Sequence, residues 1–417
     1  MSAGDDGAPA PLPSRGDALT SGQRLVYVLT LGALVMLGPF TIDMYLPAFP
    51  EIAVEFGASE AAIQLTLTGT LIGFAIGQLV IGPLSDKVGR RGPLLFATAL
   101  HICASVGVAL APDVLAMGIL RVLQGFATAG GGVVAMATVR DLFQGQRLVR
   151  MLARLALVSG LGPILAPLIG SQLLRVVEWR GVFWFLAIWG AVMLVLAALL
   201  IVETRPKELR AGHANRSVGD RYRALFRDRV FIGTSLVGGF TFSAIFSYVS
   251  SSSFLFQDVF GLDAQQFGLV FGANSLGLAL SNQISSRVMR RISPAWVIAV
   301  AITGMFLASV TIAVSGVLGG GLWSVIVPLF MLVCFAGATF PAVQVMALAP
   351  HGEEAGTAAS ILGAVNFGLS GAISPLVGVL GIGSAMSMGI VQAGALACAI
   401  VTLWIVVRPW TVPRIAD

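Results

Sequence analysis

The sequence predicts an all-α polytopic membrane protein of two six-helix bundles, and composition is the first reason. Of its 417 residues, 57% are hydrophobic and only 11% are charged, whereas soluble domains carry about a quarter charged residues. The second reason is a series of apolar runs of about 20 residues, the length of helix that crosses a hydrocarbon core of roughly 30 Å. A surface of this composition is expected to face lipid.

Twelve of these runs are expected to span the membrane, six on each side of an arginine-rich cytoplasmic linker at 204–228. Residues 1–23 lack the basic start of a signal peptide and are expected to form a disordered cytoplasmic tail. The two six-helix halves are then 24–203 and 229–417. The predicted spans lie near 25–48, 60–83, 93–111, 114–138, 151–173, 181–202, 229–256, 264–287, 295–316, 320–348, 355–380 and 386–408.

The basic residues predict the orientation, because the loops that retain Lys and Arg face the cytoplasm. With the N-terminus inside, Arg175 and Arg180 fall outside and Arg121 falls within a span, so that 22 of the 25 Lys and Arg are cytoplasmic. Both termini are therefore expected in the cytoplasm. The net charge of +5 reflects topology and not nucleic-acid binding. The scarcity of lysine suggests a GC-rich bacterial genome, and hence the bacterial inner membrane.

Two loops repeat at an offset of 200 residues. Residues 84–91, after the second span, match residues 284–291, after the eighth, in their serine and paired arginines. Because the two stretches occupy equivalent places in the two halves, they indicate a parallel duplication. Ser286 replaces Asp86 in the second copy, so any function of the acid is expected in the first half alone.

Two charged residues fall inside predicted spans, Asp43 in the first and Arg121 in the fourth. A charge at mid-bilayer costs about 2.5 to 3.5 kcal/mol on insertion scales unless it is paired or solvated. Both residues are expected at a similar depth in the outer half of the membrane. The pair is interpreted as a proton site with a counter-cation; the alternatives are a fixed ion pair that joins two helices, or a charge solvated in an outer vestibule.

Several motifs, in the correct order along the chain, resemble those of the major facilitator superfamily and of its Bcr/CflA drug:proton antiporters. They are Ile42-Asp43-Met44-Tyr45-Leu46-Pro47-Ala48 in the first span, Gly82-Pro-Leu84-Ser-Asp86-Lys87-Val-Gly89-Arg90-Arg91 after the second, Arg121-Val-Leu-Gln124-Gly125 in the fourth, and Gly160-Leu-Gly162-Pro163 with Ala166-Pro167-Leu-Ile-Gly170 in the fifth. The resemblance covers nearly the whole chain. It implies the twelve-helix fold of that superfamily.

The resemblance implies that Asp43 exchanges protons and that Arg121 senses its charge. It implies that Asp86 lies beside the start of the eleventh helix, pairs with an arginine such as Arg140, and latches the cytoplasmic side shut. The alternative is a loop that only anchors the topology. Val35 stands where some related exporters carry a second acid, which suggests one proton per cycle. The whole set expected in this gating loop is Gly82, Asp86, Gly89, Arg90, Arg91 and Arg140.

The fifth span is expected to bend at its prolines and to pack closely through its glycines against Gly268 and Gly272 of the eighth. The resemblance places this span at the interface between the halves; a kinked packing helix with no role in transport is the alternative. The antiporter residues of this span are Gly162, Pro163, Pro167 and Gly170.

Aromatic, methionine and amide side chains of the first, fourth, seventh and tenth spans are candidates for substrate binding, because such side chains adapt to varied apolar solutes. Each of them could instead face lipid or pack inside a bundle. The candidates are Phe40, Met44, Tyr45, Gln124, Phe242, Phe246, Phe335 and Gln344.

These features predict a proton-coupled exporter of small, moderately hydrophobic drugs, such as amphenicol-like or bicyclomycin-like compounds. The alternative is export of an endogenous metabolite or a self-made antibiotic by the same mechanism. Neither lysine lies in a Walker A motif and the three histidines form no H-E-x-x-H motif, so an ATP-driven pump or a zinc enzyme is not expected. The partners expected are the drug, protons and lipid, without cofactor, metal or nucleic acid, and the protein is expected to act as a monomer.

Overall fold

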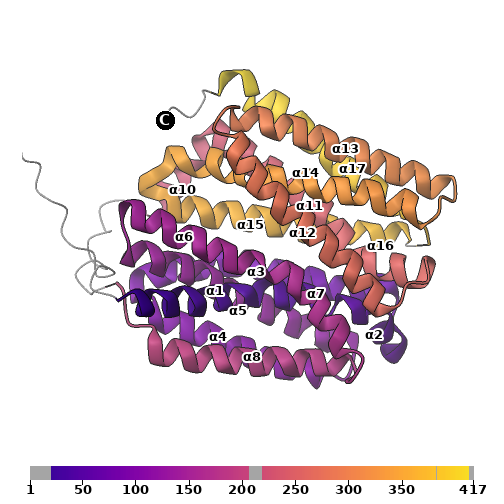
Figure 1. The fold of residues 1–417 in the computed structure, drawn as a ribbon, viewed down its shortest axis with the longest axis horizontal. Coiled ribbons are helices and arrows are strands. Elements are labelled where there is room, and N and C mark those ends of the chain that lie inside the picture. Colours follow the sequence, from indigo (N-terminus) through magenta and orange to yellow (C-terminus); the bar gives the residue numbers. More distant parts are fainter. Residues whose placement is uncertain (1–19, 206–217, 382, 413–417) are drawn as a thin grey trace, which may run out of the picture.

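The computed structural model describes residues 20–205, 218–381 and 383–412, which are almost entirely helical. Figure 1 shows the N-terminal helices, in purple, packed as one bundle against the C-terminal helices, in orange and yellow. The N-terminal bundle comprises α1 (Ser21–Asp43), η2 (Leu46–Ala48), α2 (Phe49–Phe56), α3 (Glu60–Val88), α4 (Arg91–Ala109), α5 (Val114–Leu142), α6 (Gly145–Gly160), α7 (Gly162–Leu173) and α8 (Trp179–Leu200).

The C-terminal bundle follows a short helix in the expected linker, α10 (Val218–Arg227). It comprises α11 (Arg229–Phe254), η4 (Leu255–Val259), α12 (Ala264–Val288), α13 (Pro294–Val317), α14 (Leu322–Leu348), η5 (Ala349–Glu354), α15 (Ala355–Ile373), α16 (Leu376–Leu380), α17 (Ala385–Thr402), η6 (Leu403–Val407) and η7 (Pro409–Thr411).

Ten helical segments among the described residues are long and apolar enough to cross a membrane. The other two predicted spans are present but fail these criteria for different reasons. The span expected at 151–173 is divided into α6 and α7 at Leu161, where glycines flank the break and Pro163 starts the next helix. The span expected at 264–287 is the single helix α12, which carries several amide and hydroxyl side chains.

Capping side chains explain where several helices start. Thr20 and Gln23 form a capping box, so α1 begins at Ser21, three residues before the boundary expected at 24. Residues 1–19 of the expected tail lie outside the described residues. Asp113 caps the start of α5 by accepting from the backbone N–H of Ala116.

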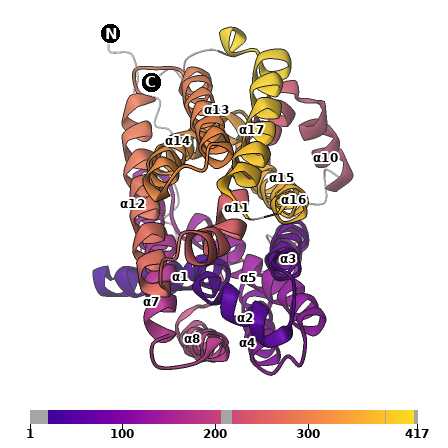
Figure 2. The same cartoon turned by 90° about the vertical axis from the view of Figure 1, so that its right-hand side faces the viewer.

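Two helix pairs join the bundles: α3 lies along α15 and α16, and α7 lies along α12, as the views agree (Figure 2). We call the end of the molecule that carries the start of α1 and residues 86–91 the basic end. The opposite end, which carries α2 and the connection between α7 and α8, is the far end.

The far end is closed between the bundles. Gln257 Nε2 donates to the carbonyl oxygen of Pro47 at 3.0 Å, and the Phe49 and Phe254 rings lie 5.7 Å apart. Gln265 Nε2 donates to the carbonyl oxygen of Ser171 at 3.2 Å. Both hydrogen bonds lie at the far end and hold the two bundles together there.

Candidate functional site

Asp43, the last residue of α1, is buried with only 7% of its surface exposed. The structure gives its carboxyl group no hydrogen bond and no ion pair with any described residue. A helix C-terminus carries partial negative charge, so α1 itself offers an anion no stabilisation here. An unpaired carboxyl in such a place is a group that can take up and release a proton.

Arg121 of α5 is fully buried and lies beside the same segment of α1. Its Nη1 donates to the carbonyl oxygen of Thr41 at 2.9 Å, and its guanidinium carbon lies 4.0 Å from the centroid of the Tyr45 ring. Nε and Nη2 are buried without a hydrogen-bond partner among the described residues. Arg121 thus holds the residues on both sides of Asp43 but not its carboxylate, and the fixed ion pair considered as an alternative is absent.

Gln124, a candidate for substrate binding, positions Arg121 in this structure. Its Oε1 accepts from Arg121 Nη1 at 2.7 Å, and its Nε2 donates to Ser105 Oγ of α4 at 2.8 Å. Both ends of the amide are therefore committed inside the N-terminal bundle, where the side chain is fully buried.

Other candidates for substrate binding also pack inside their own bundles. Phe40 lies 5.4 Å from the ring of Trp189 on α8, and Tyr45 lies against Phe183 and Arg121. Met44 is fully buried beneath α7. In the C-terminal bundle, Phe335 faces Gly304 of α13, where a Cβ would approach the ring within 2.6 Å. Helix rotation, which the sequence does not specify, turns these side chains toward their neighbours.

Phe242 and Phe246 belong instead to an aromatic cluster that joins the bundles near the middle of the helices. The Phe74 ring of α3 stacks on Phe367 of α15 at 4.5 Å, and Phe242 contacts Phe367 at 5.6 Å and Phe340 of α14 at 4.8 Å. Phe242, Phe340 and Phe367 keep part of their surface accessible. We call Phe74, Phe242, Phe246, Phe340 and Phe367 the aromatic cluster. Gln344, one turn beyond Phe340, is exposed.

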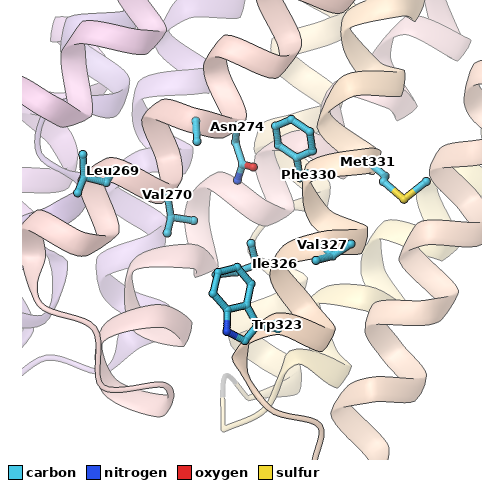
Figure 3. Close-up of a pocket in the computed structure, with 9 residues that line it drawn as sticks. Leu269, Val270, Asn274, Trp323, Ile326, Val327, Phe330 and Met331 are labelled. Carbon is cyan, nitrogen blue, oxygen red and sulfur yellow. The ribbon is translucent and has the colours of Figure 1, made fainter.

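An apolar cleft of about 400 Å³ opens between α12 and α14 (Figure 3). None of the predicted substrate residues lines it. Its polar wall residue is Asn274, whose amide donates to the Tyr248 hydroxyl at 3.0 Å. The exposed side chains around it, including Trp323 and Leu269, belong to helix faces that meet lipid. Among the described residues, no group of three His, Cys, Asp or Glu side chains could hold a metal ion.

Asp86, in the loop at the basic end, pairs with Arg90 at 2.8 Å and with Arg205 at 3.2 Å. Arg90 is 5% exposed, and its Nε also donates to Asp141 at 2.8 Å. Burial lowers the pKa of Arg90, but the hydrogen bond and charge of Asp141, with the charge of Asp86, raise it overall. The guanidinium therefore stays charged and joins the ends of α3 and α5.

In this structure Arg140 is not the partner of Asp86, which pairs with other arginines. Arg90, one turn after Asp86, and Arg205, which follows α8, reach the carboxylate instead. Glu203, shortly after α8, accepts from the backbone N–H of Arg90 at 2.9 Å. Two features of the sequence could have indicated these partners. One is the Glu203-Thr-Arg run directly after an apolar span, and the other is Asp141 beside Arg140.

The equivalent loop of the C-terminal bundle lacks this network. Ser286 Oγ donates only to the carbonyl oxygen of Asn282 on its own helix. Within the described part of the chain, Arg287, Arg290 and Arg291 form no ion pair. The expected asymmetry between the loops is therefore present in this conformation.

The glycines of α7 allow close packing on both sides. A Cβ added at Gly170 would lie 1.9 Å from the carbonyl oxygen of Met44, so α7 lies directly on the end of α1. On its other face, Gly268 of α12 meets Ser171 and the Pro167 carbonyl, and Gly272 meets Leu168. The packing of this span against Gly268 and Gly272 is confirmed, and α7 connects the Asp43 region to the C-terminal bundle.

Gly170→Ala is therefore expected to destabilise the protein by about 1 to 3 kcal/mol, because the contact is backbone and cannot rotate away. Gly160→Ala is the matched control, since a Cβ there meets nothing within 4 Å and alanine favours the helix by about 0.5 to 1 kcal/mol. Thermal unfolding in detergent measures both. Equal melting temperatures for Gly170→Ala and the wild type would contradict the close packing.

The two packed bundles, with one acid and one base buried inside the membrane spans of the first of them, define a multi-pass membrane transporter. The family model of the Major Facilitator Superfamily matches residues 31–375, and the chain belongs to this family. The expected fold is thereby confirmed. Members of the family are transporters and not enzymes.

Relatives match over most of their length. An uncharacterized MFS-type transporter, YdgK, of Bacillus subtilis is 34% identical over 86% of this chain and 90% of its own. A bicyclomycin resistance protein homolog of Haemophilus influenzae is 29% identical over 87% and 91%. The multidrug resistance protein MdtL of Shigella dysenteriae is 29% identical over 90% and 93%. The names of the last two support the resemblance to Bcr/CflA-type transporters.

Solved structures share the fold at low sequence identity. The xylose transporter XylE of E. coli, in a partially occluded inward-open conformation, gives a TM-score of 0.74 at 14% identity over 93% of this chain and 98% of its own. The human organic anion transporter MFSD10 gives 0.69 at 19% identity over 92% and 100%.

Proposed function

We propose that the protein is a proton-coupled exporter of small, moderately hydrophobic drugs in the bacterial inner membrane. The observation that carries this proposal is the buried, unpartnered carboxyl of Asp43 beside a buried arginine that contacts Thr41 and Tyr45, two residues before and two residues after it. The names of the relatives from Haemophilus influenzae and Shigella dysenteriae support drugs as the substrates.

The proton cycle follows from these contacts. A protonated Asp43 is neutral and needs no partner, as in this structure. When Asp43 loses its proton, the free Nε and Nη2 of Arg121 offer charge-assisted hydrogen bonds to the new carboxylate. Arg121 then leaves Thr41 and Tyr45, and the end of α1 can rearrange. Because α7 lies on this end of α1 and on α12, the change can reach the interface between the bundles.

The basic end is assigned to the cytoplasm because it carries nearly all the Lys and Arg. The closed far end then faces outward, and both termini lie inside. The accessible rings of the aromatic cluster are candidates for contact with a flat apolar substrate that enters from the cytoplasm. One copy of the chain contains both bundles, which supports a monomer as the working unit.

One proton moving through 100 mV supplies about 2.3 kcal/mol, which can sustain a substrate concentration ratio of roughly 50-fold across the membrane. This is enough to drive export of a small solute.

The test is a panel of amphenicols, bicyclomycin and sulfonamides applied to bacteria that express the protein. At least one compound should become less toxic, and a proton uncoupler should remove the protection. Protection that survives the uncoupler would contradict proton coupling. Export of a cell metabolite without any resistance would favour the alternative, an exporter of an endogenous compound or a self-made antibiotic.

A further inference from the structure

A buried polar network lies behind Arg121 and ends at His101 of α4. His101 and Thr128 are both buried. The imidazole Nδ1 lies 3.2 Å from Thr128 Oγ1, and Thr128 Oγ1 lies 3.4 Å from Thr41 Oγ1 of α1. Through Gln124 and Ser105 the same network holds Arg121 and returns to the backbone of α4. Three helices are thus joined around one titratable ring.

The hydrogen bonds of Thr128 determine the tautomer of the His101 ring. Thr128 has one hydroxyl hydrogen, and its closest acceptor is the carbonyl oxygen of Gln124 at 2.7 Å. Thr128 can then only accept from His101, so Nδ1 must carry a hydrogen. The other nitrogen, Nε2, is buried with no hydrogen-bond partner among the described residues. The ring is therefore neutral, with its hydrogen on Nδ1 and a lone pair on Nε2.

A second proton would not fit this network. It would place an N–H on Nε2, where the described residues provide no acceptor, and would add a positive charge that Arg121 opposes. The helices packed against α4 are α3, α5 and α8. Arg121 is their only charged group away from a helix end; the others are Glu60, Asp86 and Lys87 of α3, Arg140 and Asp141 of α5, and Arg180 of α8.

We infer that His101 is a positioning residue for Arg121: the neutral ring holds the guanidinium on Thr41 and Tyr45, and protonation of the ring releases it. This inference rests on the proposed function, in which the movement of Arg121 is the response to the charge of Asp43. Protonation of His101, on the α4 side of the network, would release Arg121 from Thr41 and Tyr45. Arg121 could then approach Asp43. His101 would thereby set the acidic limit of the pH range in which Arg121 is held.

The test is nuclear magnetic resonance of the full-length protein in detergent, labelled in its 3 histidines and 4 tyrosines. Signals are assigned by His101→Asn and Tyr45→Phe. At neutral pH, the ¹⁵N shifts of His101 should show hydrogen on Nδ1 alone. As the pH is lowered, the Tyr45 ring signal should shift together with the titration of His101, because the guanidinium leaves the ring.

His101→Asn is the informative variant, since its amide can donate to Thr128 but cannot take up a proton. In this variant the Tyr45 signal should keep its neutral-pH position throughout the range in which His101 titrates in the wild type. His351→Asn is the matched control, because His351 pairs with Asp228 at the basic end; there the Tyr45 shift should remain. His101→Phe, which fills the space without a donor, should weaken the hold on Arg121 at every pH by roughly fivefold or more.

Hydrogen on Nε2 at neutral pH, or a Tyr45 shift that is the same in His101→Asn and the wild type, would overturn the inference. Neither measurement needs a substrate or a proton gradient. A failure of the proposed function, recognised by uncoupler-resistant export, is therefore separate from a failure of this assignment.

Discussion

Asp43→Asn is expected to abolish proton-coupled export while the protein still folds and inserts. The carboxyl has no partner in the structure, so an amide of the same shape replaces the protonated form without breaking a contact. It cannot release a proton, and Arg121 receives no carboxylate to approach. Transport of the substrate into inverted membrane vesicles measures the effect. With 100 mV imposed, the wild type can accumulate substrate roughly 50-fold, whereas Asp43→Asn should not accumulate it at all.

The matched control for this change is Asp113→Asn. Asp113 caps α5 by accepting from the N–H of Ala116 at 2.8 Å, and asparagine caps a helix equally well. The control should therefore transport like the wild type. Uphill transport by Asp43→Asn at the wild-type rate would remove Asp43 from the mechanism, whereas exchange of substrate without a gradient is expected to survive in it.

Arg121→Ala is expected to be the most damaging single change to the N-terminal bundle. It removes a charge-assisted hydrogen bond to Thr41 and one to Gln124, each worth about 1.5 to 3 kcal/mol. It also removes the contact with the Tyr45 ring, worth about 2 kcal/mol where water is excluded. Thermal unfolding in detergent should show a loss of several kcal/mol.

Arg121→Lys separates charge from geometry. Lysine keeps the positive charge but lacks the planar guanidinium group. That group donates hydrogen bonds from one nitrogen while its flat face lies on the Tyr45 ring. We expect export well below the wild-type rate, with a smaller loss of stability than for alanine. Arg175→Lys, an exposed change at the far end, is the control. Wild-type export by Arg121→Lys would show that charge alone suffices.

Composition and order along the chain predicted the architecture. A chain with this few charges can satisfy its backbone in lipid only as helices or a closed barrel, and runs of about 20 apolar residues selected helices. The two intramembrane charges were found because each stands out against apolar neighbours. The packing of α7 on Gly268 and Gly272 was predictable because small residues mark close helix contacts.

The partners of the site residues were less predictable. Phe335 and Gln124 lie in helices that are apolar on most sides, so no amphipathic pattern says which face meets the pathway. His101 and Thr128 stand 27 positions apart, and only the packing of α4 on α5 brings them together. Arg205 reaches Asp86 because the chain returns to the basic end after α8.

By itself, the sequence determined a two-bundle membrane transporter with one acid and one base inside the first bundle, because solvation energy is a property of composition and position along the chain. The tertiary structure alone decided that Arg121 holds Thr41 and Tyr45 and leaves the carboxyl of Asp43 free. These contacts depend on how three helices are rotated about their axes and packed against one another. Hydrogen bonds act only over about 3 Å, so their partners are fixed by packing and not by spacing in the sequence.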